Sequence, residues 1–220
     1  MINVAIVGVS GFTGLELVKQ LITHPYFHIS YIANSEGETN LSELHSMFEG
    51  VLNMPVSKAN ASDIAKCSDV ALLALPHKSS MEFAKELLEL GIKVVDLSAD
   101  YRLELEHYES NYCEHIDKTN IGKAGYAIPE LFRESLKNRD LISSPGCYPT
   151  ATLLGIAPFL PYIKEGANIF IDAKSGVSGA GKKCSTTTHF VTINENIFAY
   201  NPLKHRHAIE IYEKIEKLSS

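Results

Sequence analysis

Residues 4–14 read VAIVGVSGFTG, and this stretch decides the fold that the sequence predicts. The run Val4–Val7 is short, apolar and rich in valine, as in a buried strand, whereas Leu15–Ile22 has apolar residues at helical spacing. Glycines at positions 8, 11 and 14 lie between the two. Such a turn lets a pyrophosphate approach the helix N-terminus, although the shifted spacing is also compatible with a tight turn that binds no ligand. We predict a Rossmann-type dinucleotide-binding unit.

The same alternation of apolar runs and helix-period segments continues along the chain. We predict strands at Val4–Val7, Ile29–Ala33, Val70–Leu75, Val94–Leu97, Leu141–Ser143 and Asn168–Ala173, and helices at Leu15–Ile22, Met81–Leu90, Thr150–Leu160 and Arg206–Leu218. Ser79 and Ser80 are candidate caps for the second helix, and Gly91 is a candidate stop. Strands that alternate with helices indicate βαβ units, so the predicted fold class is α/β with a Rossmann-type parallel sheet. We place a domain boundary between residues 146 and 147.

Composition narrows the classes of function. The chain has 220 residues, 45% of them hydrophobic, and a formal net charge of -6, which argues against a nucleic-acid partner. Its apolar runs are far shorter than the roughly 20 residues that cross a bilayer. The N-terminus carries no basic segment or cleavage site, so we expect a cytoplasmic protein. The four cysteines lack C-x-x-C spacing, which predicts free thiols and no metal site.

The end of the second predicted strand bears on the choice of cofactor. An acidic residue there is typical of NAD enzymes, but this strand ends in Asn34-Ser35-Glu36. Asn34 and Ser35 could donate hydrogen bonds to a 2′-phosphate, which favours NADP. Neither has a basic neighbour in the sequence, and Glu36 could instead pair with a ribose. NADP is the preferred cofactor, with NAD as the alternative.

Cys147 is the candidate nucleophile. It follows Pro145-Gly146, which turns the chain sharply, and it precedes a predicted helix whose positive N-terminus favours a thiolate. A thiolate could form a thioester that keeps an acyl group electrophilic. Cys184, beside Lys182 and Lys183, is the second candidate. Cys67 is expected to be a buried apolar residue.

A second glycine-rich loop spans residues 175–183, SGVSGAGKK. It comes within one residue of a nucleoside-triphosphate-binding pattern, but Lys183 stands where a hydroxyl should bind magnesium, and poor helix formers follow it. We expect this loop to wrap the nicotinamide end of the cofactor.

His205-Arg206-His207 places two titratable rings and a fixed cation at the start of the last predicted helix. An imidazole could activate a thiol and protonate an oxyanion, and Arg206 could hold a carboxylate or a phosphate. A solvated basic helix start is the alternative. Zinc is disfavoured, because residues two apart do not share a helical face.

Taken in order, these and other motifs resemble the N-acetyl-gamma-glutamyl-phosphate reductases, a branch of the semialdehyde dehydrogenase family, over nearly the whole chain. The resemblance is carried by residues 8–14 (GVSGFTG), 74–77 (ALPH), 96–103 (DLSADYRL), 128–130 (IPE), 145–150 (PGCYPT), 175–181 (SGVSGAG) and 205–210 (HRHAIE).

The resemblance implies an NADPH-dependent reduction of an acyl phosphate to a semialdehyde and phosphate, in arginine biosynthesis, by a homo-oligomer (dimer or tetramer). It implies Cys147 as the nucleophile and His207 as the acid/base, with His205 as the alternative. The implied cofactor-binding residues are Gly8, Ser10, Gly11, Phe12, Thr13, Gly14, Ser35, Leu75, Pro76, Ser178 and Gly179. The substrate-binding residues are Arg102, Ser175, His205, Arg206 and Glu210.

Two departures from the family pattern matter. Glu36 follows Ser35 where the family frequently has a basic residue. Family members also continue well beyond the His-Arg-His helix, so the resemblance implies an α+β catalytic domain truncated at its C-terminus. Two alternatives remain: an aspartate-semialdehyde dehydrogenase with the same chemistry, and a catalytically silent dinucleotide-binding module.

Overall fold

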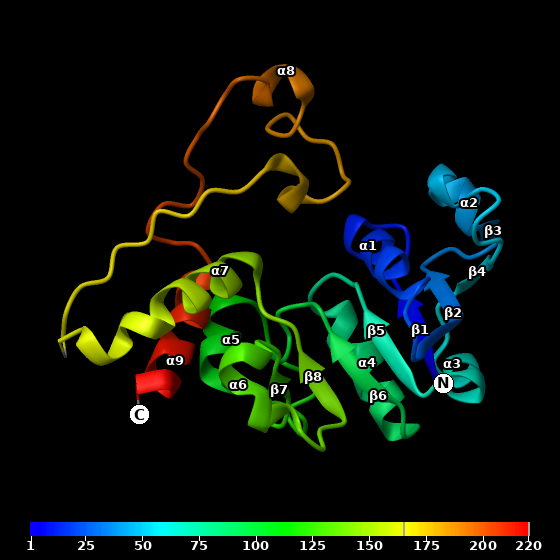
Figure 1. Ribbon diagram of the computed structural model, residues 1–220, viewed down its shortest axis with the longest axis horizontal. Helices are drawn as coiled ribbons and strands as arrows, with labels where there is room; N and C mark the ends of the chain where they lie inside the picture. Colours follow the sequence, from blue (N-terminus) through cyan, green and yellow to red (C-terminus); the bar gives the residue numbers. More distant parts are fainter. Residues whose placement is uncertain (165, 220) are drawn as a thin grey trace.

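The computed structural model describes residues 1–164 and 166–219, and its centre is a single sheet (Figure 1). The eight strands lie in the order β3-β4-β2-β1-β5-β6-β8-β7 and are parallel, except that β3 runs antiparallel to β4. Strand order reverses between β1 and β5, which is the arrangement of a Rossmann-type fold. The predicted α/β class is confirmed.

The predicted strand-helix alternation is largely confirmed, with small shifts at the ends of elements. The strands are β1 (Ile2–Val7), β2 (Phe27–Asn34), β3 (Thr39–Asn40), β4 (Pro55–Lys58), β5 (Val70–Leu73), β6 (Lys93–Asp96), β7 (Gly125–Tyr126) and β8 (Leu141–Ser143). The helices are α1 (Phe12–Leu21), α2 (Leu41–Leu44), η1 (Ser46–Phe48), α3 (Ala61–Cys67), α4 (Ser79–Glu89), α5 (Leu105–Asn111), α6 (Pro129–Leu136), α7 (Cys147–Ile156), η2 (Ala157–Tyr162), η3 (Val177–Ala180), α8 (Phe190–Ile193) and α9 (His207–Ser219).

Helices cover both faces of the sheet. One face packs against α1 and α2 through Val18, Leu21 and Leu41, and the other packs against α3 and α4 through residues such as Ile64 and Met81. Strands buried on both faces read as near-continuous apolar runs, which is why residues 4–7 and 70–73 lack polar alternation.

The last helix, α9, lies against α7 beside the β7–β8 edge of the sheet (Figure 1). Its apolar residue Ile215 packs near Leu153 of α7. Its polar residues are also buried: Glu213 accepts hydrogen bonds from Glu104 N at 3.0 Å and His107 Nδ1 at 2.9 Å, and Lys214 Nζ donates to Arg102 O at 2.5 Å. These hydrogen bonds anchor α9 to α5 and to the residues just before it.

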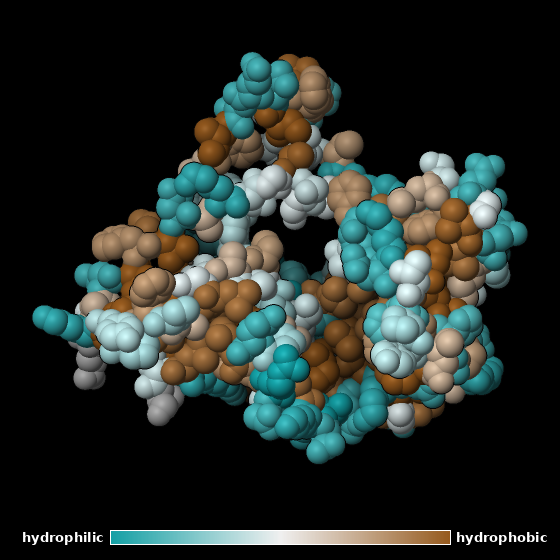
Figure 2. Space-filling view, viewed as in Figure 1, coloured by the Kyte–Doolittle hydropathy of each residue, from teal (hydrophilic) through white to brown (hydrophobic). Residues whose placement is uncertain are grey.

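Residues 166–204 form a projecting segment that arches away from the body before it returns to α9 (Figure 1). The predicted strand Asn168–Ala173 is wrong, because these residues pair with no strand in the described chain and Phe170 is 93% exposed. An isolated strand leaves its backbone hydrogen-bonding groups unpaired. Exposed apolar side chains gather on the segment (Figure 2), including Phe190, Val191 and Ile197.

Two local expectations were wrong, and one expected helix has different bounds. The N-cap of α4 is Lys78, at φ 72°, and Ser79 and Ser80 lie inside the helix, although Gly91 does end it at φ 80°. The helix expected at Thr150–Leu160 begins earlier, at Cys147, and gives way after Ile156 to a 3₁₀ turn that contains two prolines. Cys67 is exposed rather than buried.

All four cysteines are free, as predicted. Among the described helices, none combines the length and the apolar character that crossing a membrane requires.

Two helical glycines give a matched test of packing at the first loop. We expect Gly14→Ala to destabilise the protein by about 1–3 kcal/mol, because the added Cβ would lie 2.4 Å from the Gly8 carbonyl oxygen, a backbone atom that cannot rotate away. The same change at Gly155 in α7 would meet no atom within 4 Å. We expect it to stabilise the protein by about 0.5–1 kcal/mol. Urea unfolding of both variants checks the sign, and a neutral Gly14→Ala would contradict the packing described.

Candidate active site

The first glycine loop joins β1 to α1 at the edge where strand order reverses. Gly8 adopts φ +94°, and a Cβ on it would lie 2.2 Å from the carbonyl oxygen of Ala74, directly after β5. The Ala74 amide in turn donates to Val7 O at 2.8 Å. The two loops after β1 and β5 therefore touch through their backbones, and only glycine fits at position 8. Leu75 and Pro76 follow at the same edge.

The N-terminus of α1 offers space and donors for a phosphate. Gly11 is the N-cap and no side chain caps the helix, so the amides of the first turn have no side-chain acceptor. A Cβ on Gly11 would meet only Gly8 O, at 3.7 Å. Free amides at a helix start attract an anion, and open space beside a glycine allows close approach. These residues fit the pyrophosphate of a dinucleotide.

Asn34, at the end of β2, braces this loop through its side chain. Its Nδ2 donates to Ser10 Oγ at 2.9 Å, and its Oδ1 accepts from the amides of Glu36 at 2.9 Å and Gly37 at 2.6 Å. One N–H of the Asn34 amide is thus bound within the loop, and its donation to a 2′-phosphate stays a prediction. Ser35 is exposed beside it.

Cys147 is the first residue of α7 and is exposed. The helix has no side-chain cap and no acidic residue in its first turn, so its positive end faces the sulfur unopposed. Gly146, the residue before it, lies against the His207 ring: a Cβ at position 146 would be 2.7 Å from Nε2. Glycine is required there, and it brings an imidazole to the peptide that precedes the cysteine.

The His207 ring is held in its neutral form. Burial is the main cause that lowers its pKa to about 4, and the charges of His205, Arg102, Arg206 and His77 act in the same direction. Its Nδ1 is buried and has no hydrogen-bond partner among the described residues. A neutral imidazole near a thiol can accept a proton.

The ring of His205 forms more hydrogen bonds than the ring of His207. Its Nδ1 accepts from the His207 amide at 3.1 Å, and its Nε2 lies 3.3 Å from the Tyr200 hydroxyl, which donates to Tyr148 OH at 3.0 Å. Both ring nitrogens of His205 are therefore hydrogen-bonded, whereas Nδ1 of His207 has no partner among the described residues. This difference favours His207 as the acid/base.

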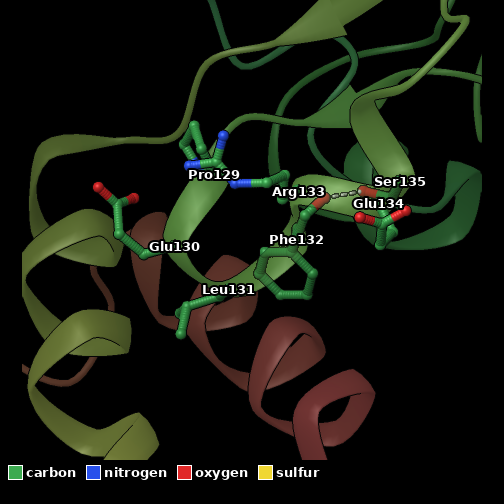
Figure 3. Close-up of a pocket in the computed structure, with 7 residues that line it drawn as sticks. All are labelled: Pro129, Glu130, Leu131, Phe132, Arg133, Glu134 and Ser135. Atoms are coloured by element: carbon green, nitrogen blue, oxygen red, sulfur yellow. Dashed lines mark hydrogen bonds between the residues drawn. The ribbon is translucent and has the colours of Figure 1, made fainter.

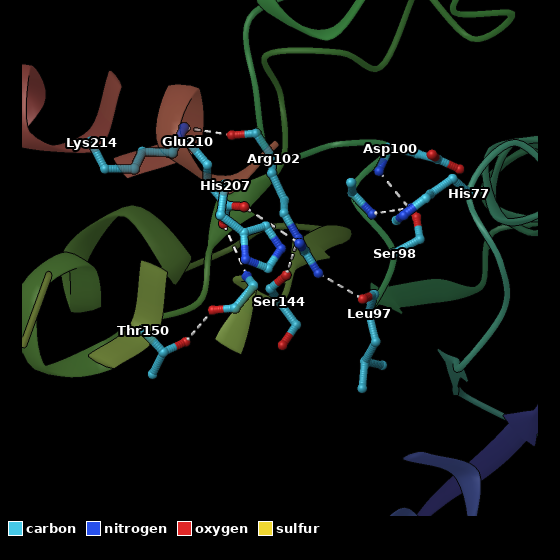
Figure 4. A network of polar contacts seen from close by, with 12 residues as sticks. His77, Leu97, Ser98, Asp100, Arg102, Ser144, Thr150, His207, Glu210 and Lys214 are labelled. Carbon is cyan, nitrogen blue, oxygen red and sulfur yellow. Dashed lines mark hydrogen bonds and ion pairs between the residues drawn. The ribbon is translucent and has the colours of Figure 1, made fainter. Parts of the chain in front are cut away.

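Glu210 and Arg102 form a buried network behind the site (Figure 4). One carboxylate oxygen of Glu210 accepts from Tyr126 OH at 2.7 Å and Gly146 N at 3.0 Å, and the other lies 3.4 Å from Arg102 Nη1. Arg102 also donates to Ser144 O at 2.7 Å and to Leu97 O at 2.8 Å. Both carboxylate oxygens of Glu210 and three N–H groups of Arg102 are thus bound within the protein, and the predicted substrate contacts of these two residues stay predictions. They position the turn before Cys147.

Arg206 remains available for an anion. Its side chain is exposed, its guanidinium lies 5.1 Å from the centre of the Tyr112 ring, and it forms no ion pair within the described ranges. The stacking holds the side chain without using its hydrogen-bond donors.

The second glycine loop contains η3, so part of the expected loop is helical. Ser175, Ser178 and Gly179 are exposed on the projecting segment. Lys182 Nζ donates to Ser10 O at 3.3 Å and links this segment to the first glycine loop. The structure thereby brings the two glycine loops together across 172 positions of sequence.

Sequence reasoning missed several supporting residues. We assigned no role to Tyr126, Tyr148 or His77. The His77 ring, in the motif after β5, accepts a hydrogen bond from Ala99 N, in the motif after β6, at 3.0 Å. The only indication in the sequence was that tyrosine and histidine side chains can form hydrogen bonds in a site. A separate hollow over α6 is lined by residues 129–135 (Figure 3) and contains none of the predicted site residues.

Comparisons with known proteins agree with the fold and the motifs. Residues 3–139 match the family model "Semialdehyde dehydrogenase, NAD binding domain", and residues 147–220 match "Semialdehyde dehydrogenase, dimerisation domain". Aspartate semialdehyde dehydrogenase II from Vibrio cholerae has a similar fold, with a TM-score of 0.53 at 20% identity over 74% of this chain and 43% of that one. The enzyme from Candida albicans, solved with NADP, gives 0.52 at 16% identity over 74% and 47%.

Proteins with higher sequence identity to this chain are named N-acetyl-gamma-glutamyl-phosphate reductases, not aspartate semialdehyde dehydrogenases. The N-acetyl-gamma-glutamyl-phosphate reductase of Sulfurovum sp. (strain NBC37-1) is 62% identical over 99% of this chain and 65% of its own length. That of Wolinella succinogenes is 59% identical over 98% and 64%. The chain thus spans slightly less than two thirds of the length of these relatives.

The pKa of His207 gives a direct test of the site's electrostatics. We expect its ring to titrate near pH 4 by NMR, below the ordinary value of 6.5. Because the folded-state pKa is lowered, the fold prefers the neutral ring, so this residue costs stability as pH falls from about 6.5 towards 4. His207→Gln should lose less stability over that window than the parent chain. A ring that titrates at its ordinary pKa would contradict the burial described.

Glu210→Gln tests the buried network. Losing the charge leaves the Arg102 guanidinium buried without its carboxylate, so we expect a loss of about 3 kcal/mol in urea unfolding. The control is Glu106→Gln on α5, an exposed carboxylate for which we expect a change within about 0.5 kcal/mol. Equal effects in the two variants would show that the network contributes nothing specific.

Proposed function

Because the chain belongs to the semialdehyde dehydrogenase family, we propose that it binds NADP and reduces an acyl phosphate through a thioester on Cys147. The proposed substrate is N-acetyl-gamma-glutamyl phosphate, and the proposed products are the 5-semialdehyde and phosphate. The observation that carries the proposal is the packing of the His207 ring on Gly146, directly before an exposed cysteine at a helix N-terminus.

Each of these groups has a chemical task. His207 accepts the thiol proton, and the sulfur of Cys147 attacks the acyl carbonyl carbon, so that a C–S bond forms while the C–O bond to phosphate breaks. NADPH, when bound, supplies the hydride that reduces the thioester. His207 then returns a proton, and the C–S bond breaks to release the aldehyde and the thiol. The ring is neutral at pH 7 and so has a free nitrogen for the thiol proton, and its lowered pKa favours the later return of that proton.

The remaining residues bind and orient. The amides at the start of α1, with Gly8, Gly11 and Gly14 around them, hold the pyrophosphate of the cofactor. Arg206 is the cation proposed for the phosphate or the carboxylate of the substrate. The contact of Lys182 with Ser10 supports a role for the second glycine loop beside the cofactor.

We also propose that the whole protein is a cytoplasmic homo-oligomer, a dimer or a tetramer, that acts in arginine biosynthesis. Support comes from the match of residues 147–220 to a dimerisation domain and from the exposed apolar side chains of the projecting segment. Apolar groups of this kind are commonly buried at an interface.

Two alternatives differ in their outcomes. An aspartate-semialdehyde dehydrogenase would use the same residues on a different acyl phosphate, but the two solved enzymes described above share only 20% and 16% identity with this chain. The greater identity of the reductases favours the acetylglutamyl substrate. A silent dinucleotide-binding module would bind the cofactor without a reactive thiol.

Cys147→Ser is the decisive variant. In the phosphate-dependent reverse direction, we expect the parent chain to oxidise N-acetylglutamate semialdehyde with NADP⁺, and the serine variant to lose at least a thousandfold, because a neutral hydroxyl is a far weaker nucleophile than a thiolate. Cys184→Ser is the matched control and should retain activity. Parallel assays with aspartate semialdehyde separate the two substrates.

Thiol reactivity provides a readout that needs no turnover. Iodoacetamide should label Cys147 faster than the exposed Cys67, and mass spectrometry of the labelled peptides measures both in one sample. Equal activity in Cys147→Ser, or slower labelling of Cys147 than of Cys67, would overturn the thioester mechanism.

A further inference from the structure

An NADP-binding site needs a positive charge beside the 2′-phosphate, and the usual place for it is empty of cations in this chain. Residues 34–37 read NSEG and contain no lysine or arginine. Glu36 is exposed there and would repel a phosphate. The Asn34 side chain is bound to Ser10 and to the amides of Glu36 and Gly37. A compensating cation must come from another element.

The neighbouring strand ends in a lysine at the same level of the sheet. Strand β4 pairs in parallel with β2, and Lys58 stands opposite Asn34 in that register. The two strands remain joined just beyond, where Ala59 N donates to Asn34 O at 2.9 Å. Ile32 and Val56 both lie in the core that includes α1. Because side chains alternate along a strand, Asn34 and Lys58 share that face of the sheet.

The turn after β2 packs directly on this lysine. Gly37 adopts φ +74°, and a Cβ on it would lie 2.6 Å from Lys58 N and 3.2 Å from Lys58 Cβ. The segment that carries Ser35 and Glu36 therefore runs beside the base of the Lys58 side chain. Lys58 is exposed and takes part in no ion pair within the parts of the chain that the structure describes. Its ammonium is available to a ligand.

We propose that Lys58 supplies the positive charge that recognises the 2′-phosphate of NADP, with the Ser35 hydroxyl beside it. The proposal rests on the proposed function, because it concerns the cofactor site of that reaction. In this arrangement the cation comes from β4 and not from the residues after β2. The flexible side chain of a lysine reaches the phosphate as a point charge and needs no fixed fork geometry.

The test compares dissociation constants for NADP⁺ and NAD⁺, measured by calorimetry on the full chain. We expect Lys58→Met to weaken NADP⁺ binding roughly ten- to a hundredfold and to leave NAD⁺ within about twofold. Lys58→Arg should restore most of the NADP⁺ affinity. Lys123→Met is the matched control, because it changes the net charge equally and lies just before β7, at the opposite edge of the sheet.

A second probe isolates the phosphate. Binding of 2′-AMP should fall in Lys58→Met, whereas binding of 5′-AMP should not. Equal loss of NADP⁺ and NAD⁺ affinity, or an unchanged preference for NADP⁺, would overturn the assignment of Lys58 while leaving the thioester chemistry of Cys147 intact. If the parent chain binds neither dinucleotide, the cofactor of the proposed function fails and this inference fails with it.

Discussion

The arrangement of the site depends on one buried carboxylate. Glu210 accepts hydrogen bonds from the Gly146 amide and the Tyr126 hydroxyl and pairs with Arg102, which itself donates to the Ser144 and Leu97 carbonyls. These contacts join α9, the end of β7, the loop after β6 and the turn before α7. His207 lies one helical turn before Glu210 on α9, so fixing the carboxylate also fixes the imidazole beside that turn. Burying a charge is unfavourable unless the charge has hydrogen-bond or ion-pair partners. Here the partners of Glu210 come from several different elements of the fold and offset that unfavourable free energy.

The sequence predicted correctly those elements whose conformation depends mainly on residues close to each other in the chain. The run 4–7, the glycine loop and α1 follow from apolar periodicity and from backbone positions that exclude a Cβ, and both are legible in a single stretch. The start of α9 was found in the same way. The strand expected at residues 168–173 failed because a strand also needs a partner, and periodicity in one segment carries no information about the neighbour.

The roles of Arg102 and Glu210 show where sequence reasoning stops. Both residues belong to motifs of charged side chains. If these side chains were exposed, each could contact a substrate, and this is why the sequence predicted that role. They are instead buried against each other across 108 positions of sequence, a distance that no motif spacing encodes. The polar, aromatic stretch from Tyr101 to Ile121 has the composition of a functional loop. Tyr101, Tyr108 and His115 nevertheless lie in the interior, where their polar atoms bond to Asp117 and Asp100. Composition alone does not distinguish a solvated polar group from a satisfied buried one.

The contact between Gly8 and Ala74 has a consequence for how a nucleotide enters. The loops after β1 and β5 meet backbone to backbone, with no side chain between them whose rotation could open a gap. This part of the proposed dinucleotide site is therefore preorganised, and little conformational entropy remains to be lost there when a dinucleotide binds. On the side of the projecting segment, the long and flexible Lys182 side chain reaches the same loop by its hydrogen bond to Ser10 O, so adjustment to a bound nucleotide is easier there. A nucleotide on this loop would thus meet fixed backbone on one side and an adjustable side chain on the other.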